Sequence, residues 1–227
     1  MLLTTLTTSL TWNIPMNEFT NNLLDVIRQK ESQGNYNIFA GDKPTTNRNL
    51  TNRTLNDVIR IQGQKAAGAY QFKPKTLQTL MKDLQLTGKE KFTPELQDQL
   101  AMRLLERRGL NDYLSGNIDT PTFGLNVAKE WASLPVLAPT KGYRGRSVEP
   151  GMSFYEGYGS NRALLKGEDF DRYQTLLSMG APRPEVVPAR GILSQAADMV
   201  TAPIAAATDY LGDVFWNPRK LFGRTTD

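Results

Sequence analysis

The stretch that decides the fold lies near the start of the chain and reads Lys30-Glu31-Ser32-Gln33-Gly34-Asn35-Tyr36-Asn37. It places a single acidic residue where an amphipathic helix gives way to a polar turn. Counting back in fours from this acid gives Ile27, Leu23 and Phe19. A helix over residues 18–31 would therefore align the Glu31 carboxylate with an apolar stripe. This spacing predicts an acid that points towards the protein interior.

Two features of this position favour the protonated form of Glu31. The unpaired carbonyls at a helix C-terminus carry a partial negative charge, and apolar neighbours exclude water. A free glutamate titrates near ~4.3, and its pKa must rise to roughly 6–7 for efficient proton donation at neutral pH. The pattern indicates a general acid. The alternative is a helix-end glutamate that rotates out to solvent, which is the commoner fate of a single acid.

Composition restricts the available chemistry to carboxylates. The 227 residues include no cysteine and no histidine, which excludes thiol nucleophiles, Ser-His and Cys-His dyads, and the usual zinc sites. We expect no metal and no cofactor. A hydrophobic share of 39% and a charged share of 22% predict a soluble globular protein. The net charge of +4 favours anionic partners, but does not choose among nucleic acid, acidic wall polymer and lipid headgroups.

The remaining pattern predicts an α+β fold that is mainly α-helical. Proline and capping signals predict helices that begin at residues 74, 94 and 120, and a last core helix near residues 162–178. Residues 36–61 lose helical periodicity and are rich in Asn, Thr and Gly, which predicts a small irregular β-hairpin with a long loop. Together with the first helix, this gives five or six helices and one hairpin.

The chain divides into one domain with two extensions. Residues 1–16 form a Thr-rich N-terminal extension that lacks the basic and apolar regions of a secretory signal. Residues 17–179 hold the core domain, and residues 180–190 are a linker stiffened by three prolines. Residues 191–227 are Ala-rich and amphipathic, which suits docking to another protein or lying on a membrane surface.

Several short blocks between residues 24 and 177, about two-thirds of the chain, carry a family resemblance. In order they are Glu31 with the following turn and Tyr36, Ala67-Gly68-Ala69-Tyr70-Gln71-Phe72, Phe92-Thr93-Pro94 with Gln97-Asp98, Glu106-Arg107-Arg108-Gly109, Trp131-Ala132-Ser133-Leu134-Pro135, and Gly151-Met152-Ser153-Phe154-Tyr155-Glu156-Gly157. This series resembles the lambda-type phage lysozymes, lytic transglycosylases of the lysozyme superfamily. Several blocks in the right order are more specific than one. The chain differs at Tyr158-Gly159, where many relatives carry Asp-Gly.

The resemblance implies a lysozyme-like domain that cleaves the β-1,4 bond between MurNAc and GlcNAc in peptidoglycan. Glu31 would protonate the glycosidic oxygen and then act as base on the C6 hydroxyl of the same MurNAc, leaving a 1,6-anhydro end. Intramolecular attack gains effective molarity, so the second carboxylate that glycoside hydrolysis normally needs becomes dispensable. The candidates for a second carboxylate are Asp42, which we interpret as a turn former, and Asp57, a surface or cap residue. True hydrolysis is the alternative.

The resemblance also implies supporting roles for five residues. Ser32 would hydrogen-bond the acid or the substrate, and Gln71 offers a donor and an acceptor to N-acetyl groups. Tyr70 and Tyr155 offer rings to sugar faces, and Tyr36 is a further substrate-binding candidate. The competing interpretation of the tyrosines is half-buried packing.

Three functions remain open at this level. The first is a transglycosylase held in a phage virion, in the tail or inside the particle, which opens the wall during genome delivery. The second is a soluble endolysin, and the third is an inactive structural tail adaptor. We expect the enzyme to act at the host cell wall or periplasm, on peptidoglycan glycan strands. The C-terminal segment would contact virion proteins, with peripheral membrane contact as an alternative and no requirement for nucleic acid.

Overall fold

The computed structural model describes residues 18–159 and 161–182. Its helices are α1 (Glu18–Ser32), η1 (Leu50–Asn52), α2 (Leu55–Gln62), α3 (Pro74–Asp83), α4 (Pro94–Arg107), α5 (Leu110–Leu114), α6 (Thr120–Glu130), η2 (Tyr143–Gly145) and α7 (Glu168–Gly180). Strands β1 (Thr140–Lys141) and β2 (Ser147–Val148) flank η2 and form an antiparallel pair. The expected α+β, mainly α-helical fold class is confirmed.

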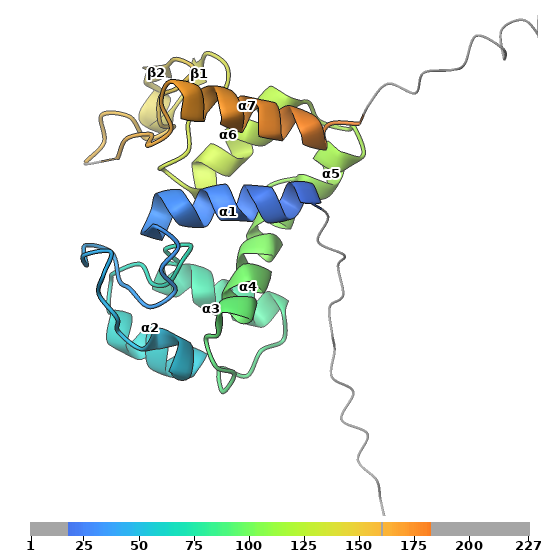
Figure 1. Cartoon of the computed structure of the whole chain (residues 1–227). Helices are drawn as coiled ribbons and strands as arrows, with labels where there is room; N and C mark the ends of the chain where they lie inside the picture. Colours follow the sequence, from blue (N-terminus) through green and yellow to red (C-terminus); the bar gives the residue numbers. More distant parts are fainter. Residues whose placement is uncertain (1–17, 160, 183–227) are drawn as a thin grey trace, which may run out of the picture. The chain divides into compact units, whose positions relative to one another are not determined.

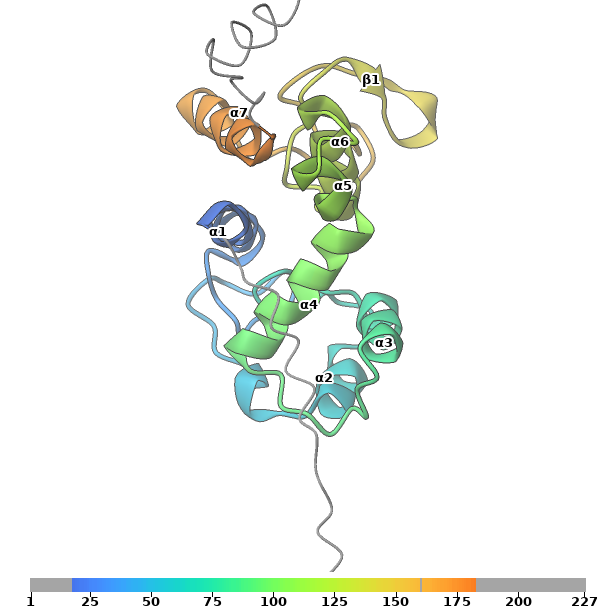
Figure 2. The same ribbon diagram turned by 90° about the vertical axis from the view of Figure 1, so that its right-hand side faces the viewer.

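Helix α1 lies between two groups of elements (Figures 1 and 2). One group contains α2, α3 and the start of α4, and the other contains α5, α6, α7 and the β1–β2 pair. Helix α4 runs from the first group to the second (Figure 2). Helix α1 packs against both α4 and α7. The end of α1 is therefore a point where both groups can contribute side chains.

The core explains why these segments are helical. On α1 the buried apolar residues are Phe19, Leu23, Leu24 and Ile27, spaced as one face of a helix requires. They join a single hydrophobic cluster with side chains of α4, α6 and α7, including Leu100, Phe123 and Tyr173. Each fully buried Leu, Ile or Phe contributes roughly 1.5–3 kcal/mol relative to exposure. This packing fixes the direction of α1 and the position of its last turn.

The predicted helix starts are confirmed by their caps. Helices α3, α4 and α6 each carry proline in the first turn. The side chain of Thr93 accepts a hydrogen bond from the Leu96 N–H, and that of Asp119 accepts one from the Thr122 N–H. The sequence predicts that the last core helix begins near residue 162. In the structure it begins at residue 168, directly after Gly167, whose φ is 53°.

The predicted position of the hairpin is wrong. Residues 55–62 form helix α2, because the Thr54 side chain caps the Asp57 N–H and Asp57 Oδ2 accepts the Thr54 hydroxyl in return. Leu55 and Val58 then bury the inner face of the helix. The antiparallel pair lies instead at residues 140–148, with Thr140 opposite Val148.

The predicted extensions fall outside the described part of the chain. Residues 1–17 and 183–227 hold the N-terminal extension, most of the linker and the amphipathic C-terminal segment. Within the described residues, no helix combines the length and the apolar character needed to span a bilayer.

Candidate active site

The Glu31 carboxyl group is hydrogen-bonded to a serine from a distant part of the chain. The Ser133 hydroxyl donates a hydrogen bond of 2.6 Å to Glu31 Oε1, across a sequence separation of 102 residues. Glu31 lies in the last turn of α1 and is half-buried, whereas Ser133 follows α6 and is buried. The candidate site is thus assembled from the end of α1 and the loop after α6.

The surroundings of Glu31 favour its neutral form. Burial of the carboxyl group raises the pKa of Glu31 above its ordinary value, and this outweighs the hydrogen bonds from the Ser133 hydroxyl and backbone, which lower it. Among the described residues, no cation and no second carboxylate contributes to this shift. A desolvated carboxyl group without a charged partner is the arrangement expected of a general acid.

The loop that carries Ser133 is held on two sides. The indole N–H of Trp131 donates to the Tyr70 carbonyl oxygen at 3.2 Å, and the Ser153 hydroxyl donates to the Ala132 carbonyl oxygen at 2.8 Å. Ser133 is therefore a pre-positioned partner for the acid. No local pattern in the sequence gives this serine a role in the site; the available signal was its place in the Trp-Ala-Ser-Leu-Pro block.

A second carboxylate organises the turn after α1. Asp98 Oδ1 accepts hydrogen bonds from the Tyr36 and Tyr70 hydroxyls at 2.8 and 2.7 Å. Arg28 donates to the Tyr36 hydroxyl at 2.7 Å and lies 3.6 Å from Asp98 Oδ2. We call Arg28, Tyr36, Tyr70 and Asp98 the Asp98 cluster. Burial and then Asp98 raise the pKa of Tyr36 to about 12, and the same two causes raise the pKa of Tyr70.

Gln97 ties three further segments together. Its side chain is fully buried; Oε1 accepts from the Ala69 N–H at 2.8 Å, and Nε2 donates to the carbonyls of Phe92 and Tyr36 at 2.9 and 3.2 Å. A Cβ at Gly68 would lie 2.2 Å from Gln97 Oε1, so the glycine is required for this contact. Gln97 belongs to one of the blocks that carry the family resemblance, but its role in the site does not follow from any local sequence pattern.

Three predicted substrate-binding residues have intramolecular partners. Ser32 is buried and donates to the Arg28 carbonyl at 3.0 Å, not to the acid. Tyr70 is only 1% exposed, so its ring lies in the core and has no free face. Tyr36 is half-buried, and its hydroxyl belongs to the Asp98 cluster.

Gln71 and Tyr155 remain partly accessible. Gln71 adopts φ 53° in a tight turn, where its Nε2 donates to the Gly68 carbonyl at 2.8 Å. Its Oε1 makes no hydrogen bond within the described residues and is available to a ligand. Tyr155 donates its hydroxyl to the Lys129 carbonyl at 2.7 Å, and its ring lies 5.5 Å from that of Tyr143.

The two candidates for a second catalytic carboxylate have structural partners. Asp42 accepts from the Phe39 N–H at 2.8 Å and from Arg48 at 2.7 and 3.0 Å, and its pKa is lowered to about 2 by Arg48 and by that backbone bond. Asp57 accepts from Thr54 and Arg60. The predicted turn and cap roles of these two acids are confirmed. Within the described residues, no group of three or more acidic side chains is placed to hold a metal ion.

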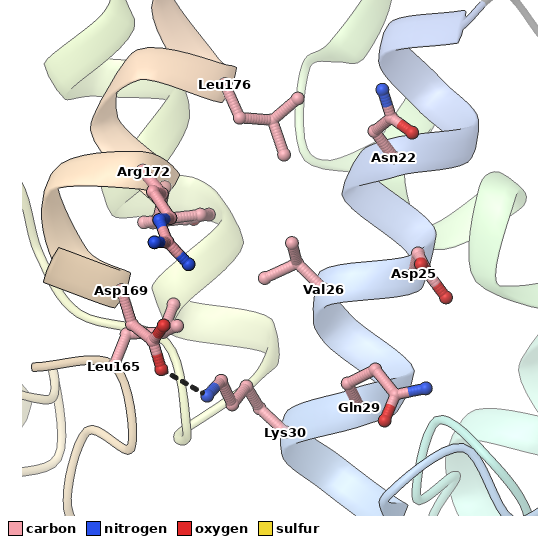
Figure 3. A pocket seen from close by; sticks show the side chains of 10 residues that line it. Asn22, Asp25, Val26, Gln29, Lys30, Leu165, Asp169, Arg172 and Leu176 are labelled. Atoms are coloured by element: carbon pink, nitrogen blue, oxygen red, sulfur yellow. Dashed lines mark hydrogen bonds and ion pairs between the residues drawn. The ribbon is translucent and has the colours of Figure 1, made fainter.

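A pocket of about 380 Å³ lies elsewhere, between α1 and α7 (Figure 3). Lys30 and Asp169 form an ion pair of 2.9 Å at one end of it. The apolar part of its lining includes Val26, Leu165, Tyr173 and Leu176. Neither Glu31 nor Ser133 lines this pocket. We place the candidate site at Glu31 because that is where a carboxyl group has the required chemistry.

Comparison with known families agrees with this assignment. The family model described as Endolysin matches residues 13–162, which include Glu31, Ser133 and the turn around Gln71. The chain belongs to the Endolysin family. At this level the protein is a phage lytic enzyme that degrades the peptidoglycan of the host cell wall. Comparisons of this Endolysin-family chain with curated proteins and with solved structures found no significant match.

Proposed function

We propose that the protein is a peptidoglycan lytic transglycosylase of the lambda-type lysozyme kind, with Glu31 as its single catalytic carboxylate. The observation that carries the proposal is the state of this carboxyl group. Its pKa is raised by burial, and one of its oxygens is held by Ser133. The Ser133 hydroxyl is bonded to Glu31 Oε1, and we assign the transferable proton to the other oxygen, Oε2.

The proposed reaction consumes no water, because the nucleophile is the C6 hydroxyl of the substrate. Glu31 donates its proton to the glycosidic oxygen as the bond from that oxygen to MurNAc C1 breaks, which releases the GlcNAc 4-hydroxyl group. The Glu31 carboxylate then removes the proton from the MurNAc C6 hydroxyl, and the C6 oxygen bonds to C1. The product ends in 1,6-anhydro-MurNAc, and Glu31 is protonated again. The held C6 hydroxyl supplies the nucleophile at high effective concentration.

The proposal is favoured over hydrolysis by the environments of Asp42 and Asp57. A hydrolase needs a second carboxylate to activate water or to attack C1. Both oxygens of Asp42 and both oxygens of Asp57 accept hydrogen bonds within their own loop or helix turn. Hydrolysis by a muramidase remains the second candidate, because the family assignment covers peptidoglycan-degrading enzymes of either type.

We divide the predicted substrate contacts into two groups. Gln71 and Tyr155 are accessible and would contact N-acetyl groups and sugar faces. Ser32, Tyr36 and Tyr70 would hold the end of α1 and the turn at Gln71 in place. In this assignment Ser133 is a positioning residue for the acid.

We also propose that the enzyme is carried in the virion through residues 181–227. The support is a sequence argument alone: a proline-containing linker precedes an amphipathic segment, and the family match ends before both. A soluble endolysin is the alternative, and it is equally compatible with the family. A chain that ends at Gly180 should digest purified peptidoglycan normally yet be missing from purified particles. Normal packaging of this truncated chain would contradict the docking role.

Product analysis tests the reaction type. Purified peptidoglycan is digested with the full chain, and the released muropeptides are analysed by mass spectrometry with and without borohydride reduction. Transglycosylation predicts products that weigh one water less than hydrolysis products and resist reduction. Reducing MurNAc ends as the main product would overturn the transglycosylase assignment and favour the muramidase. Borohydride-treated mutanolysin digests provide the reference for reducing ends.

A further inference from the structure

An exposed group of tyrosines and arginines surrounds the β1–β2 hairpin. Tyr143 and Tyr158 are 37% and 45% exposed, and their ring centroids lie 4.8 Å apart. The Arg144 guanidinium lies over both rings, 5.5 Å from the centroid of Tyr143 and 5.0 Å from that of Tyr158. We call Tyr143, Arg144, Arg146 and Tyr158 the hairpin platform.

The backbone is specialised to present these two arginines. Arg144 has φ 58° and ψ 27°, the left-handed region that residues with a side chain rarely adopt. Stacking on two aromatic rings holds its side chain there. Arg146 lies across Gly157, where an added Cβ would be 1.7 Å from its Nη1. Gly157 is therefore needed for Arg146 to lie in this position.

Neither arginine is neutralised by the described part of the protein. Arg144 and Arg146 form no ion pair and no side-chain hydrogen bond among the described residues. By contrast, Arg48 is paired with Asp42 and Arg108 with Glu130. Two exposed guanidinium groups that share no carboxylate are suited to bind an external one, because the planar donor fork matches carboxylate geometry.

The hairpin platform is linked by hydrogen bonds to the loop that carries Ser133. The Tyr143 N–H donates to the Phe154 carbonyl at 2.8 Å, and the hydroxyl of the preceding residue, Ser153, donates to the Ala132 carbonyl at 2.8 Å. Ala132 directly precedes Ser133, the partner of Glu31. The hairpin platform and the acid are thus connected through one short, hydrogen-bonded segment.

We propose that the hairpin platform binds a carboxylate of the peptide stem carried by a sugar next to the scissile bond. This inference rests on the proposed action on peptidoglycan and adds a specificity to it. The N-acetyl sugars of the glycan strand are uncharged once their lactyl groups bear peptides, so the stems supply the carboxylates. The arginines select the charged stem, and the exposed tyrosine rings cover its apolar atoms.

The test compares two substrates and two double variants. Arg144→Gln/Arg146→Gln removes the platform charges, and Lys82→Gln/Lys89→Gln removes two exposed charges from another surface. On intact peptidoglycan we expect the arginine variant to raise KM by roughly three- to tenfold, as for exposed charge pairs, with kcat little changed. An amidase removes the stem carboxylates but leaves one lactyl carboxylate on each MurNAc. On strands stripped in this way both variants should match the unaltered protein, because the platform is proposed to bind the stem carboxylate and not the lactyl group. The lysine variant should match it on both substrates.

A binding measurement separates this site from the catalytic proposal. A soluble stem tetrapeptide is titrated into the full chain carrying Glu31→Gln, and the arginine Nε signals are followed by NMR. The tetrapeptide should shift the Arg144 and Arg146 signals, whether or not the wild-type protein cleaves the wall. No shift, or an equal KM increase on stripped strands, would overturn the inference. A KM effect that disappears when phosphate polymers are removed from the wall would also overturn it, because phosphate would then be the ligand.

Discussion

Glu31 and Asp42 lie on either side of the turn that follows α1, and the fold has opposite effects on their carboxyl groups. Glu31 is desolvated, its partner among the described residues is Ser133, and its pKa is raised. Asp42 is held by the two nitrogens of Arg48 and by a backbone N–H, and its pKa falls to about 2. Burial without a cation produces an acid that can donate a proton, whereas a paired cation produces a permanent anion.

In the proposed mechanism, this difference gives one carboxylate a chemical role and the other a structural role. Asp42 fastens the loop over residues 39–48, so its charge is already used by the fold. The charge of Glu31 is not used in this way, so its proton is available to a substrate. Changing the partners of each acid tests whether this distinction governs activity.

The largest expected effect separates the two acids directly. Glu31→Gln should lower the rate of peptidoglycan cleavage by about 10³-fold or more, because the amide has no proton to donate. It should not lower the melting temperature, since a neutral amide avoids the cost of burying a charge. Asp42→Asn should keep most activity. Release of soluble muropeptides measures both, and a Glu31→Gln protein within tenfold of wild type would contradict the assignment.

The Asp98 cluster provides a case in which a carboxylate stabilises the site without reacting. Asp98→Asn should lower the free energy of unfolding by about 2 kcal/mol, because two tyrosine hydroxyls lose a charged acceptor and Arg28 loses a nearby anion. Urea denaturation measures the change. Tyr36→Phe, which removes one hydroxyl, is the matched control and should cost about 1 kcal/mol. Equal free energies of unfolding for the Asp98→Asn protein and wild type would show that the Asp98 cluster does not stabilise the fold.

Ser133→Ala tests how Ser133 affects the pKa and the orientation of the Glu31 carboxyl group. The Ser133 hydroxyl lowers the pKa of Glu31, so its removal should raise this pKa further and move the high-pH limb of the kcat profile to higher pH. We expect kcat at neutral pH to fall by about tenfold, because the carboxyl group loses its orienting partner. A pH–rate profile measures both effects, with Ser178→Ala as an exposed control. A shift of the limb to lower pH would contradict the assigned role.

The smallest effect concerns the pH dependence of the Asp42 pair. Because the folded pKa is lowered from 3.8 to about 2, the pair stabilises the protein above pH 3.8, and this contribution is lost as the pH falls towards 2. Arg48→Gln should therefore lower the free energy of unfolding near neutral pH, and only slightly, because Arg48 is exposed to solvent. Urea titrations should show the difference from wild type shrinking in acid. A constant difference would contradict the linkage.

Local signals in the sequence predicted much of the helical fold and the place of Glu31 at the end of α1. The stripe formed by Phe19, Leu23 and Ile27 defined α1 and the direction of Glu31, and proline with capping residues marked the starts of α3, α4 and α6. Each of these signals depends on neighbours within one or two helix turns. The hairpin was misplaced because two-residue strands leave no alternating pattern, and because α2 is only 8 residues long.

The partners in the site could not be predicted in the same way. Ser133 reaches Glu31 across 102 residues, and Gln97 reaches Tyr36 across 61, so no local periodicity reports either contact. Burial also determines which tyrosine rings are accessible to a sugar of the substrate. Tyr70 is 1% exposed while Tyr158 is 45% exposed, although each lies within two residues of a glycine.

The central claim is that the fold itself raises the pKa of Glu31, and a direct titration tests it. The side-chain carboxyl carbons of the ¹³C-labelled full chain are followed by NMR as the pH is varied, and Glu31→Gln identifies the signal. We predict that Glu31 titrates above 4.5, its ordinary value, while Asp42 titrates at about 2 in the same sample. A Glu31 pKa at or below 4.5 would contradict the account, because the carboxyl group would then be an ordinary helix-end anion.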